Sequence, residues 1–173
     1  DMTQKELRDK LGYVPQKGVL FSGTIDSNIR YGKPEITDAQ VKEAAEVAQA
    51  TEFIDTKPEK YESPVSQGGT NVSGGQKQRL SIARAIAKDP EIFIFDDSFS
   101  ALDFKTDSQL RKALKEYTKD ATTVIVAQRI STILGADQII VLDDGHMAGI
   151  GTHKELMANC EVYQQIARSQ LSE

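Results

Sequence analysis

Two groups of residues in this sequence could do chemistry on a phosphate, and the first is Ser73-Gly74-Gly75-Gln76. Ser73 and Gln76 are spaced as a capping box, which predicts a helix start. Two successive glycines are a poor choice there, because each destabilises a helix interior by about 1 kcal/mol relative to alanine. Bare backbone N–H groups at the positive end of a helix dipole can bind a phosphate. The segment is either a plain helix start or an anion site, and its residues alone leave both interpretations open.

The second group is Asp96 and Asp97, which directly follow the apolar run at residues 92–95. That run predicts a buried strand, and ligands of open α/β sheets bind at the carboxyl ends of the strands. Asp96 could bind Mg²⁺, directly or through water, where the ion neutralises nucleotide phosphates. Asp97 would then lie near the attacking water. The alternative is that the two acids only cap the strand and the following turn.

The elements expected to position these groups change character along the chain. The strand pattern at residues 7–14 has no preceding element to pair with, which suggests that the sequence begins inside a domain. Residues 24–88 are mostly helical in pattern, with a capping box at Thr37 and Gln40, a Pro-, Ser- and Gly-rich loop at 57–75 and a second helix after it. The apolar positions expected to face the core are Val41, Ala44, Ala45 and Ala48 in the first helix, and Leu80, Ala83, Ile86 and Ala87 in the second.

From residue 89 to 173 the pattern alternates short apolar strands with helices, which predicts parallel strands covered on both faces. Asp144-Gly145 predicts a tight hairpin, and Thr152 with Glu155 predicts a capping box that opens the C-terminal helices. The expected fold is therefore α/β, with a helical segment at about 24–88 leading into an α/β segment at about 89–173.

The composition indicates one globular domain, or most of one, since the 173 residues are 39% apolar and 27% charged. A net charge of -5 without basic runs argues against nucleic acid or anionic lipid as the main partner. The apolar runs are far shorter than the roughly 20 residues of a membrane-spanning helix. Cys160, the only cysteine, is expected to be a small buried apolar residue. His146 and His153 are too scattered to predict a metal site.

The motifs together resemble those of the ATP-binding-cassette (ABC) ATPases. The run NVSGGQKQRLSIARA precedes IFIFDDSFSALD, with VPQ upstream and VAQR downstream, and the resemblance covers essentially the whole chain. Within the family the chain resembles a half-transporter of an exporter, because a loop at residues 63–69 precedes the SGGQ motif. The resemblance implies a P-loop NTPase (RecA-like) core with a helical subdomain, bound ATP and Mg²⁺, and a position at the cytoplasmic face of the cell membrane. It also implies a transmembrane domain encoded upstream and a second nucleotide-binding domain paired head to tail.

The same resemblance implies a role for each matching residue. Gln16 would be the Q-loop glutamine, which touches magnesium and senses the transmembrane domain. Ser73, Gly74, Gly75 and Gln76 would be the signature, which closes over nucleotide held by the partner. Asp96 would be the Walker B aspartate, and Ser100-Ala101-Leu102-Asp103 the D-loop, with Asp103 facing the nucleotide.

Three departures from the family pattern carry information. No G-x-x-x-x-G-K-[ST] loop (Walker A) occurs in these residues, since the only Gly-Lys pair, Gly32-Lys33, is followed by Pro34. We therefore expect weak ATP binding by the 173-residue chain. Asp97 stands where the family usually has a catalytic glutamate, and Gln128 where it usually has the switch histidine; an amide cannot shuttle a proton near neutral pH.

With Asp97 and Gln128, the chain resembles the degenerate member of a heterodimeric exporter. In such exporters one composite site binds ATP for a long time and the other hydrolyses it. The signature is nearly intact, with Val72 in place of the usual leucine, and should serve the competent site built on the partner. Two other classes stay open: a soluble ABC ATPase, which the short helical insert disfavours, and a non-catalytic regulatory domain. Residues 63–69 lack the acidic residues usual in the exporter loop and could be a plain surface loop. The basic residues Lys77, Arg79 and Arg84 could form a solvated helix face or meet phosphate or the opposing subunit.

Overall fold

The computed structural model describes residues 2–171, which fall into two compact units, Asp1–Val126 and Ala127–Glu173. The first unit contains, in chain order, α1 Gln4–Lys10, β1 Leu11–Val14, β2 Gly23–Thr24, α2 Ile25–Ile29, α3 Asp38–Val47, α4 Thr51–Asp55, η1 Lys60–Glu62, β3 Pro64–Val65, η2 Gln67–Gly69, α5 Gly74–Ala87, β4 Ile92–Asp96, α6 Phe104–Tyr117 and β5 Thr122–Val126. The second contains α7 Ile130–Ile133, β6 Ile139–Asp143, β7 His146–Gly151, α8 His153–Asn159 and α9 Glu161–Leu171.

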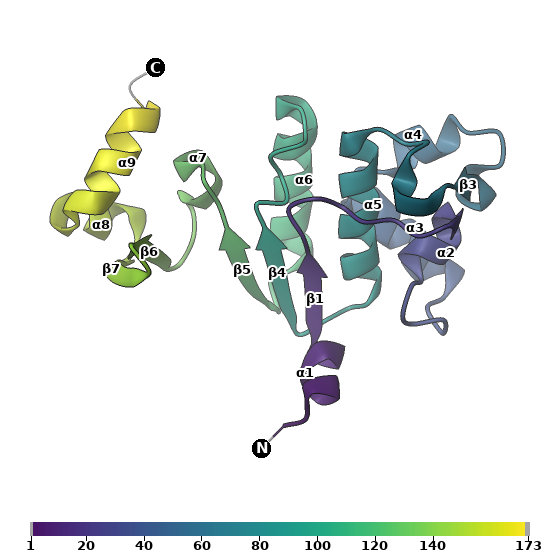
Figure 1. Ribbon diagram of the computed structural model, residues 1–173, viewed down its shortest axis with the longest axis horizontal. Helices are drawn as coiled ribbons and strands as arrows, with labels where there is room; N and C mark the ends of the chain where they lie inside the picture. Colours follow the sequence, from purple (N-terminus) through teal and green to yellow (C-terminus); the bar gives the residue numbers. More distant parts are fainter. Residues whose placement is uncertain (1, 172–173) are drawn as a thin grey trace. The chain divides into compact units, whose positions relative to one another are not determined.

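A parallel sheet of three strands, in the order β1-β4-β5, is the centre of the first unit (Figure 1). Its register pairs Val14 with Phe95 and Asp96 with Val126, so strands far apart in sequence end at one edge. On one face Phe93 and Phe95 are buried in an apolar core that includes Leu80 of α5 and Leu110 of α6. The strand at 92–96 and the parallel arrangement confirm the expected α/β fold.

The opposite face of this sheet differs from the expectation. Tyr13, Val124 and Val126 lie on that face and are 55%, 46% and 52% exposed. Within the first unit, helices cover one face of the sheet, and β5 is an edge strand although its sequence is mostly apolar. Apolar strands of this kind are normally buried between two layers in parallel sheets. The prediction of two covered faces is therefore wrong for the first unit taken by itself.

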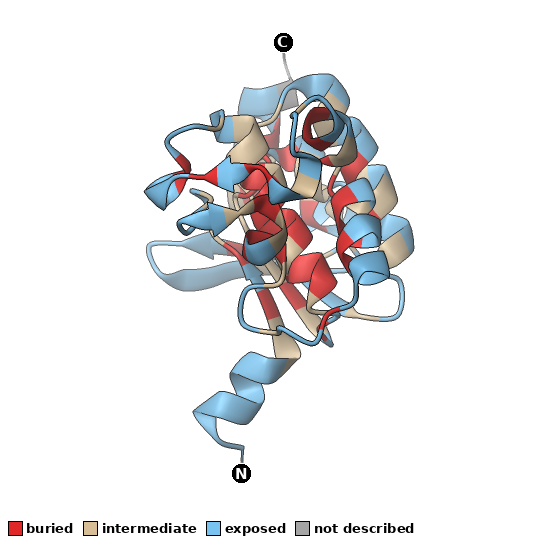
Figure 2. Cartoon of the chain, turned by 90° about the vertical axis from the view of Figure 1, so that its right-hand side faces the viewer, coloured by how far each residue is buried: buried red, intermediate tan, exposed pale blue. Residues whose placement is uncertain are grey.

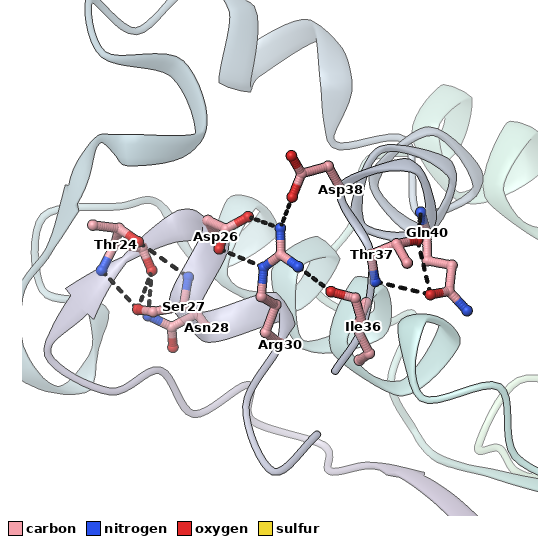
Figure 3. Close-up of polar contacts among 9 residues, drawn as sticks. All are labelled: Thr24, Asp26, Ser27, Asn28, Arg30, Ile36, Thr37, Asp38 and Gln40. Atoms are coloured by element: carbon pink, nitrogen blue, oxygen red, sulfur yellow. Dashed lines mark hydrogen bonds and ion pairs between the residues drawn. The ribbon is translucent and has the colours of Figure 1, made fainter. Parts of the chain in front are cut away.

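The helical segment packs around α5, as its apolar pattern predicts. The capping box of Thr37 and Gln40 opens α3, whose Val41, Ala44 and Ala45 are buried. Arg30 fastens the end of α2 to the start of α3 (Figure 3): its guanidinium bonds Asp26 at 2.6 and 3.0 Å and Asp38 at 2.5 Å, and it also bonds the Ile36 carbonyl. The hydrogen bonds that Arg30 donates to Asp26 and Asp38 raise the Arg30 pKa further above its usual value, so the group stays charged.

The residues expected to form a loop at 57–75 are more ordered than predicted. They include two short 3-10 helices and β3, which pairs antiparallel with β2 through Gly23 and Val65. Asn71 closes this segment, because its amide donates to the Pro64 carbonyl and its Oδ1 accepts from the Ser66 N–H. These two hydrogen bonds hold the residues directly before Ser73 against β3.

Two arginines of α5 are not on a solvated face. Arg79 donates to the Gln49 carbonyl at 2.7 Å and lies 4.8 Å from the centre of the Phe53 ring. Arg84 donates to the carbonyls of Asn28 and Val19, both at 2.8 Å. Burial lowers the pKa of both guanidinium groups. The solvated-face interpretation is wrong for these two residues, which hold α5 to the segments before it.

Helix α1 was not anticipated, although Thr3 and Glu6 form a capping box of the same kind as the others. None of its residues is buried, as the pale blue helix at the N-terminus shows in Figure 2. This exposure explains why its sequence has no clear apolar stripe. No helix in residues 2–171 has both the length and the apolar character to cross a membrane.

The second unit is a hairpin packed against helices. β6 and β7 pair antiparallel through the turn at Asp144-Gly145, and Thr152 with Glu155 caps α8, as expected. Its core contains Tyr163 and Cys160, and the burial of the cysteine confirms the interpretation of it as a small apolar residue. His153 Nδ1 lies 2.8 Å from the Tyr163 hydroxyl, which gives this histidine a role in packing.

Candidate functional site

The signature begins α5 as a capped, bare helix end. Ser73 Oγ accepts from the Gln76 N–H at 3.2 Å, and Gln76 Oε1 accepts from the Ser73 N–H at 3.1 Å. The predicted capping box is therefore present. Gly74 is exposed, and a Cβ added to it would meet no other atom of the chain within 4 Å. Its absent side chain leaves the first backbone N–H groups of the helix accessible, which an anion site requires.

Gly75 brings the signature close to the loop that follows β4. A Cβ on Gly75 would lie 3.6 Å from the Ala101 carbonyl oxygen and 3.9 Å from Leu102 Cδ2, which is ordinary contact. Neither glycine has a positive φ, and a Cβ on either would make no contact closer than ordinary van der Waals distance. The two glycines are thus required neither by backbone conformation nor by crowding, and the anion-site interpretation stays a prediction.

The two acids lie at the carboxyl edge of the sheet, where β4 ends. The Asp97 N–H donates to the Val126 carbonyl at 2.8 Å and extends the ladder between β4 and β5 by one residue. Asp97 then has a φ of 44°, in the left-handed region that aspartate tolerates better than most residues. Asp96 is thus the last residue of β4, and Asp97 is the first residue of the turn that follows it.

Side chains from β1 and the loop after it reach both acids. Gln16 Nε2 donates to Asp97 Oδ2 at 3.1 Å, and the Tyr13 hydroxyl donates to Asp96 Oδ2 at 3.1 Å. Desolvation, followed by the hydrogen bond to Asp96, raises the pKa of the Tyr13 phenol, which keeps it a donor. The structure therefore brings together Gln16, Asp96 and Asp97, three of the residues singled out in the sequence.

The chemistry of these donors fits a magnesium ion. Mg²⁺ in nucleotide sites prefers oxygen ligands and is bound by one or two protein groups together with phosphates and water. Because Gln16 uses its Nε2 on Asp97, its Oε1 is the atom that can face a cation, and Asp96 contributes a carboxylate. Among residues 2–171 no group of three or more His, Cys, Asp or Glu forms a metal site by itself. A cation here would depend on nucleotide for its remaining ligands.

Asp103 has a structural task in addition to any contact with nucleotide. It is the N-cap of α6, where Oδ1 accepts from the Thr106 N–H at 3.0 Å and Oδ2 accepts from the Thr106 hydroxyl at 2.6 Å. These bonds lower the pKa of the Asp103 carboxyl. Gln128 belongs to the second unit, where its carbonyl accepts from Gln170 Nε2 at 2.8 Å.

Three residues near the acids were not identified from sequence: Tyr13, Gln78 and Ser98. Tyr13 lies on the same face as Asp96 because the register pairs it with Ile94, two residues earlier in β4. Ser98 Oγ donates to the Val14 carbonyl at 2.7 Å, and Gln78 contacts the loop of Gln16. Which strand pairs with which is not encoded in local periodicity, so no pattern along the chain could indicate these contacts.

A parallel sheet with two acids at its carboxyl edge and a helix that starts with two glycines are the features expected of the nucleotide-binding domain of an ABC protein. The model of the family described as ABC transporter matches residues 1–100, and the chain belongs to this family. It is 46% identical over 169 residues to an uncharacterized ABC transporter ATP-binding protein of Mycobacterium tuberculosis, covering 96% of this chain and 29% of that protein.

Two further comparisons agree. The chain is 45% identical over 166 residues to a putative multidrug export ATP-binding/permease protein of Staphylococcus aureus, covering 96% of this chain and 29% of that protein. A solved structure of a bacterial Atm1-family ABC exporter with ATP bound matches 99% of this chain and 30% of that one, at a TM-score of 0.95 and 40% identity. The P-loop NTPase fold is thereby confirmed. The chain spans less than a third of the length of the relatives that it matches.

Proposed function

We propose that this chain is the distal part of the nucleotide-binding domain of an ABC exporter, which couples ATP hydrolysis to transport across the membrane. In this proposal it acts at the cytoplasmic face, joined to a transmembrane domain and paired head to tail with a second nucleotide-binding domain. The observation that carries the proposal is the contact of Gln16 with Asp97 beside Asp96 at the sheet edge. Relatives named as export ATP-binding/permease proteins support the joined transmembrane domain.

Each group then has a defined task toward nucleotide. Asp96 and Gln16 Oε1 hold Mg²⁺, which neutralises charge on the phosphates when bound. In the same proposal, Asp97 would orient water toward the γ-phosphate and accept its proton. The N–H groups at Gly74 and Gly75 bind the γ-phosphate of nucleotide held by the partner domain, helped by the α5 dipole.

Two residue types, Asp97 and Gln128, support a slow or inactive site on this chain. The Asp97 carboxylate is one methylene shorter than the usual glutamate, and a displacement of about 1 Å can reduce a rate by roughly a hundredfold. Gln128 can hydrogen-bond a phosphate but cannot relay a proton near neutral pH. We propose that this chain is the degenerate half of a heterodimer, whose signature serves the competent site of the partner. These two residues equally support a non-catalytic regulatory domain, which is the second candidate.

The uncovered face of the sheet supports the proposal that a further segment completes this domain. Tyr13, Val124 and Val126 are exposed on it, and Asp96 lies at its edge. The missing G-x-x-x-x-G-K-[ST] loop belongs by function beside Asp96, since both act on the same phosphates. A strand and helix carrying that loop would pair with β5 and cover this face.

Calorimetric titration with ATP and Mg²⁺ tests the proposal at the level of the 173-residue chain. We expect no binding at micromolar ATP, because most backbone contacts to the β- and γ-phosphates are absent. A micromolar dissociation constant would contradict the proposal that ATP binding depends on a phosphate-binding loop outside these 173 residues. In the complete transporter, photolabelling of this chain by azido-ATP should require Mg²⁺ and should weaken about tenfold or more in Asp96→Asn. Labelling unaffected by Asp96→Asn would remove the metal-binding role.

A further inference from the structure

The loop that carries Gln16 is bridged by a single buried side chain from α5. The Gly18 N–H donates to Gln78 Oε1 at 2.8 Å, and Gln78 Nε2 donates to the Pro15 carbonyl at 3.0 Å. Gln78 is only 1% exposed. Both polar ends of this amide are therefore used on the two flanks of Gln16, and loss of either bond would leave a buried group without a partner, which is unfavourable.

The same loop is held from its other side by the segment that follows β4. Ser98 Oγ donates to the Val14 carbonyl at 2.7 Å in the buried interior, and Gln16 itself donates to Asp97. The loop thus lies between the sheet edge and α5, with fixed contacts to both. Its position depends on where each of these elements is.

The backbone at Gly18 is packed directly against α5, with no room for a side chain. A Cβ on Gly18 would lie 2.8 Å from Ser81 Oγ and 3.0 Å from both Gln78 Oε1 and the Lys77 carbonyl oxygen. Gln78 is one helical turn after Gly74, the first residue of the signature helix. A rotation or shift of α5 that moves the signature must therefore move Pro15 and Gly18 or break both hydrogen bonds of Gln78.

We infer that Gln78 is a positioning residue that transmits movements of the signature helix to Gln16. The inference rests on the proposed function, in which the signature faces nucleotide held by the partner and Gln16 faces nucleotide of its own chain. Gln78 then connects the two composite sites mechanically, through backbone at Pro15 and Gly18. A glutamine that only stabilises the fold would show no dependence on Gln16.

A double-mutant cycle in the complete transporter with its partner tests this connection. The measured quantity is the Mg²⁺ concentration that half-saturates photolabelling of this chain by azido-ATP. We expect Gln16→Ala and Gln78→Leu each to raise it about tenfold, as loss of a ligand or its support does. The double variant should show no larger shift than the stronger single variant, because both act through Gln16.

Ser81→Ala is the matched control, since Ser81 lies on α5 beside Gly18 and its buried Oγ has no hydrogen-bond partner among the described residues. It should leave the Mg²⁺ requirement unchanged. If Gln16→Ala shifts the requirement and Gln78→Leu does not, or if the double variant shows the product of the two shifts, the inference is overturned and the proposed function stands. If Gln16→Ala has no effect, both fail together.

Gln78→Glu separates loss of the bridge from loss of the fold. A protonated carboxyl can accept from Gly18 and donate to Pro15 as the amide does, whereas an ionised one cannot donate. Burial raises the pKa of such a carboxyl. We expect this variant to match the unmodified transporter at pH 6 and to require about tenfold more Mg²⁺ at pH 8.5. A shift that is the same at both pH values would overturn the bridging role.

Discussion

The two regions proposed to face phosphate, the start of α5 and the end of β4, are built in different ways. Gly74 has no neighbouring atom where a side chain would be, and its region presents backbone alone. Asp96 and Asp97 have defined side-chain partners, Tyr13 and Gln16, and Asp97 has an unusual backbone conformation. The first region is complete without further side chains, whereas the second depends on the identity of each one.

This difference indicates how one half of a transporter can lose activity at one site and keep it at the other. In the proposed function, substitution of Asp97 or Gln128 affects chemistry on this chain's own nucleotide. The SGGQ motif is separated from these positions along the chain and, in the same proposal, continues to serve the partner. Altering each region separately is therefore the direct way to test whether the two are independent.

The largest effect is expected from Gly74→Asp. A carboxylate at this helix start would repel the γ-phosphate of nucleotide on the partner, and ATP hydrolysis by the complete transporter should fall about a hundredfold or more. The helix itself should tolerate the acid, which is favourable near an N-terminus. Gly135→Asp is the matched control, because a Cβ there also meets nothing within 4 Å. Hydrolysis that survives Gly74→Asp would exclude a phosphate at this helix end.

The double substitution Asp97→Glu with Gln128→His should produce the next largest effect. Asp97→Glu lengthens the carboxylate by one methylene group, and Gln128→His supplies an imidazole that can relay a proton. Hydrolysis at this chain's site should therefore rise by about tenfold or more. The measurement is turnover with the partner's catalytic site disabled. Asp120→Glu, which lengthens an exposed carboxylate elsewhere, is the control. Turnover that stays at background would contradict the account of the two substitutions.

A smaller effect is expected from Tyr13→Phe, which removes the hydroxyl that orients Asp96. The Mg²⁺ requirement for nucleotide labelling should rise by no more than about tenfold. Because the pKa of the Tyr13 phenol is raised, its proton is retained through its usual pKa, and the unmodified protein should not lose this hydrogen bond between pH 6 and 9. Tyr31→Phe serves as the control for loss of an exposed phenol. Equal effects of the two variants would argue against a role for Tyr13 at Asp96.

The smallest effect concerns the stability of the chain itself. Gly74→Ala should raise the free energy of unfolding by about 0.5 kcal/mol, since alanine restricts the unfolded chain and meets no neighbour. Gly18→Ala should lower it, because the new methyl group would lie 2.8 Å from Ser81 Oγ. Urea denaturation measures both. A loss of stability in Gly74→Ala would mean that the glycine is required by the fold and would weaken the anion-site interpretation.

Local signals predicted much of this structure. The capping boxes at Thr37, Ser73 and Thr152 are present, and so is the hairpin at Asp144-Gly145. Each depends on residues within four positions of one another, so a short stretch of sequence contains the whole signal. The α1 capping box at Thr3 carried the same signal but lacked an apolar stripe to support it.

Contacts between distant segments could not be predicted in this way. Arg79 and Arg84 are charged residues that could be solvated on a helix, yet each contacts a carbonyl and an aromatic ring from earlier in the chain. Gln78 is likewise an ordinary polar residue in sequence and a buried bridge in the structure. The acids at 96 and 97 were located correctly because the end of a buried strand is itself a local feature, while their partners were not.

The unpaired flank of β5 has a consequence for any preparation of these 173 residues alone. Its open N–H and C=O groups border exposed valines, a combination that recruits strands from other molecules. Such a polypeptide would self-associate as its concentration rises. A separately expressed peptide that supplies the neighbouring strand should suppress this self-association. Light scattering should then decrease as the peptide is added.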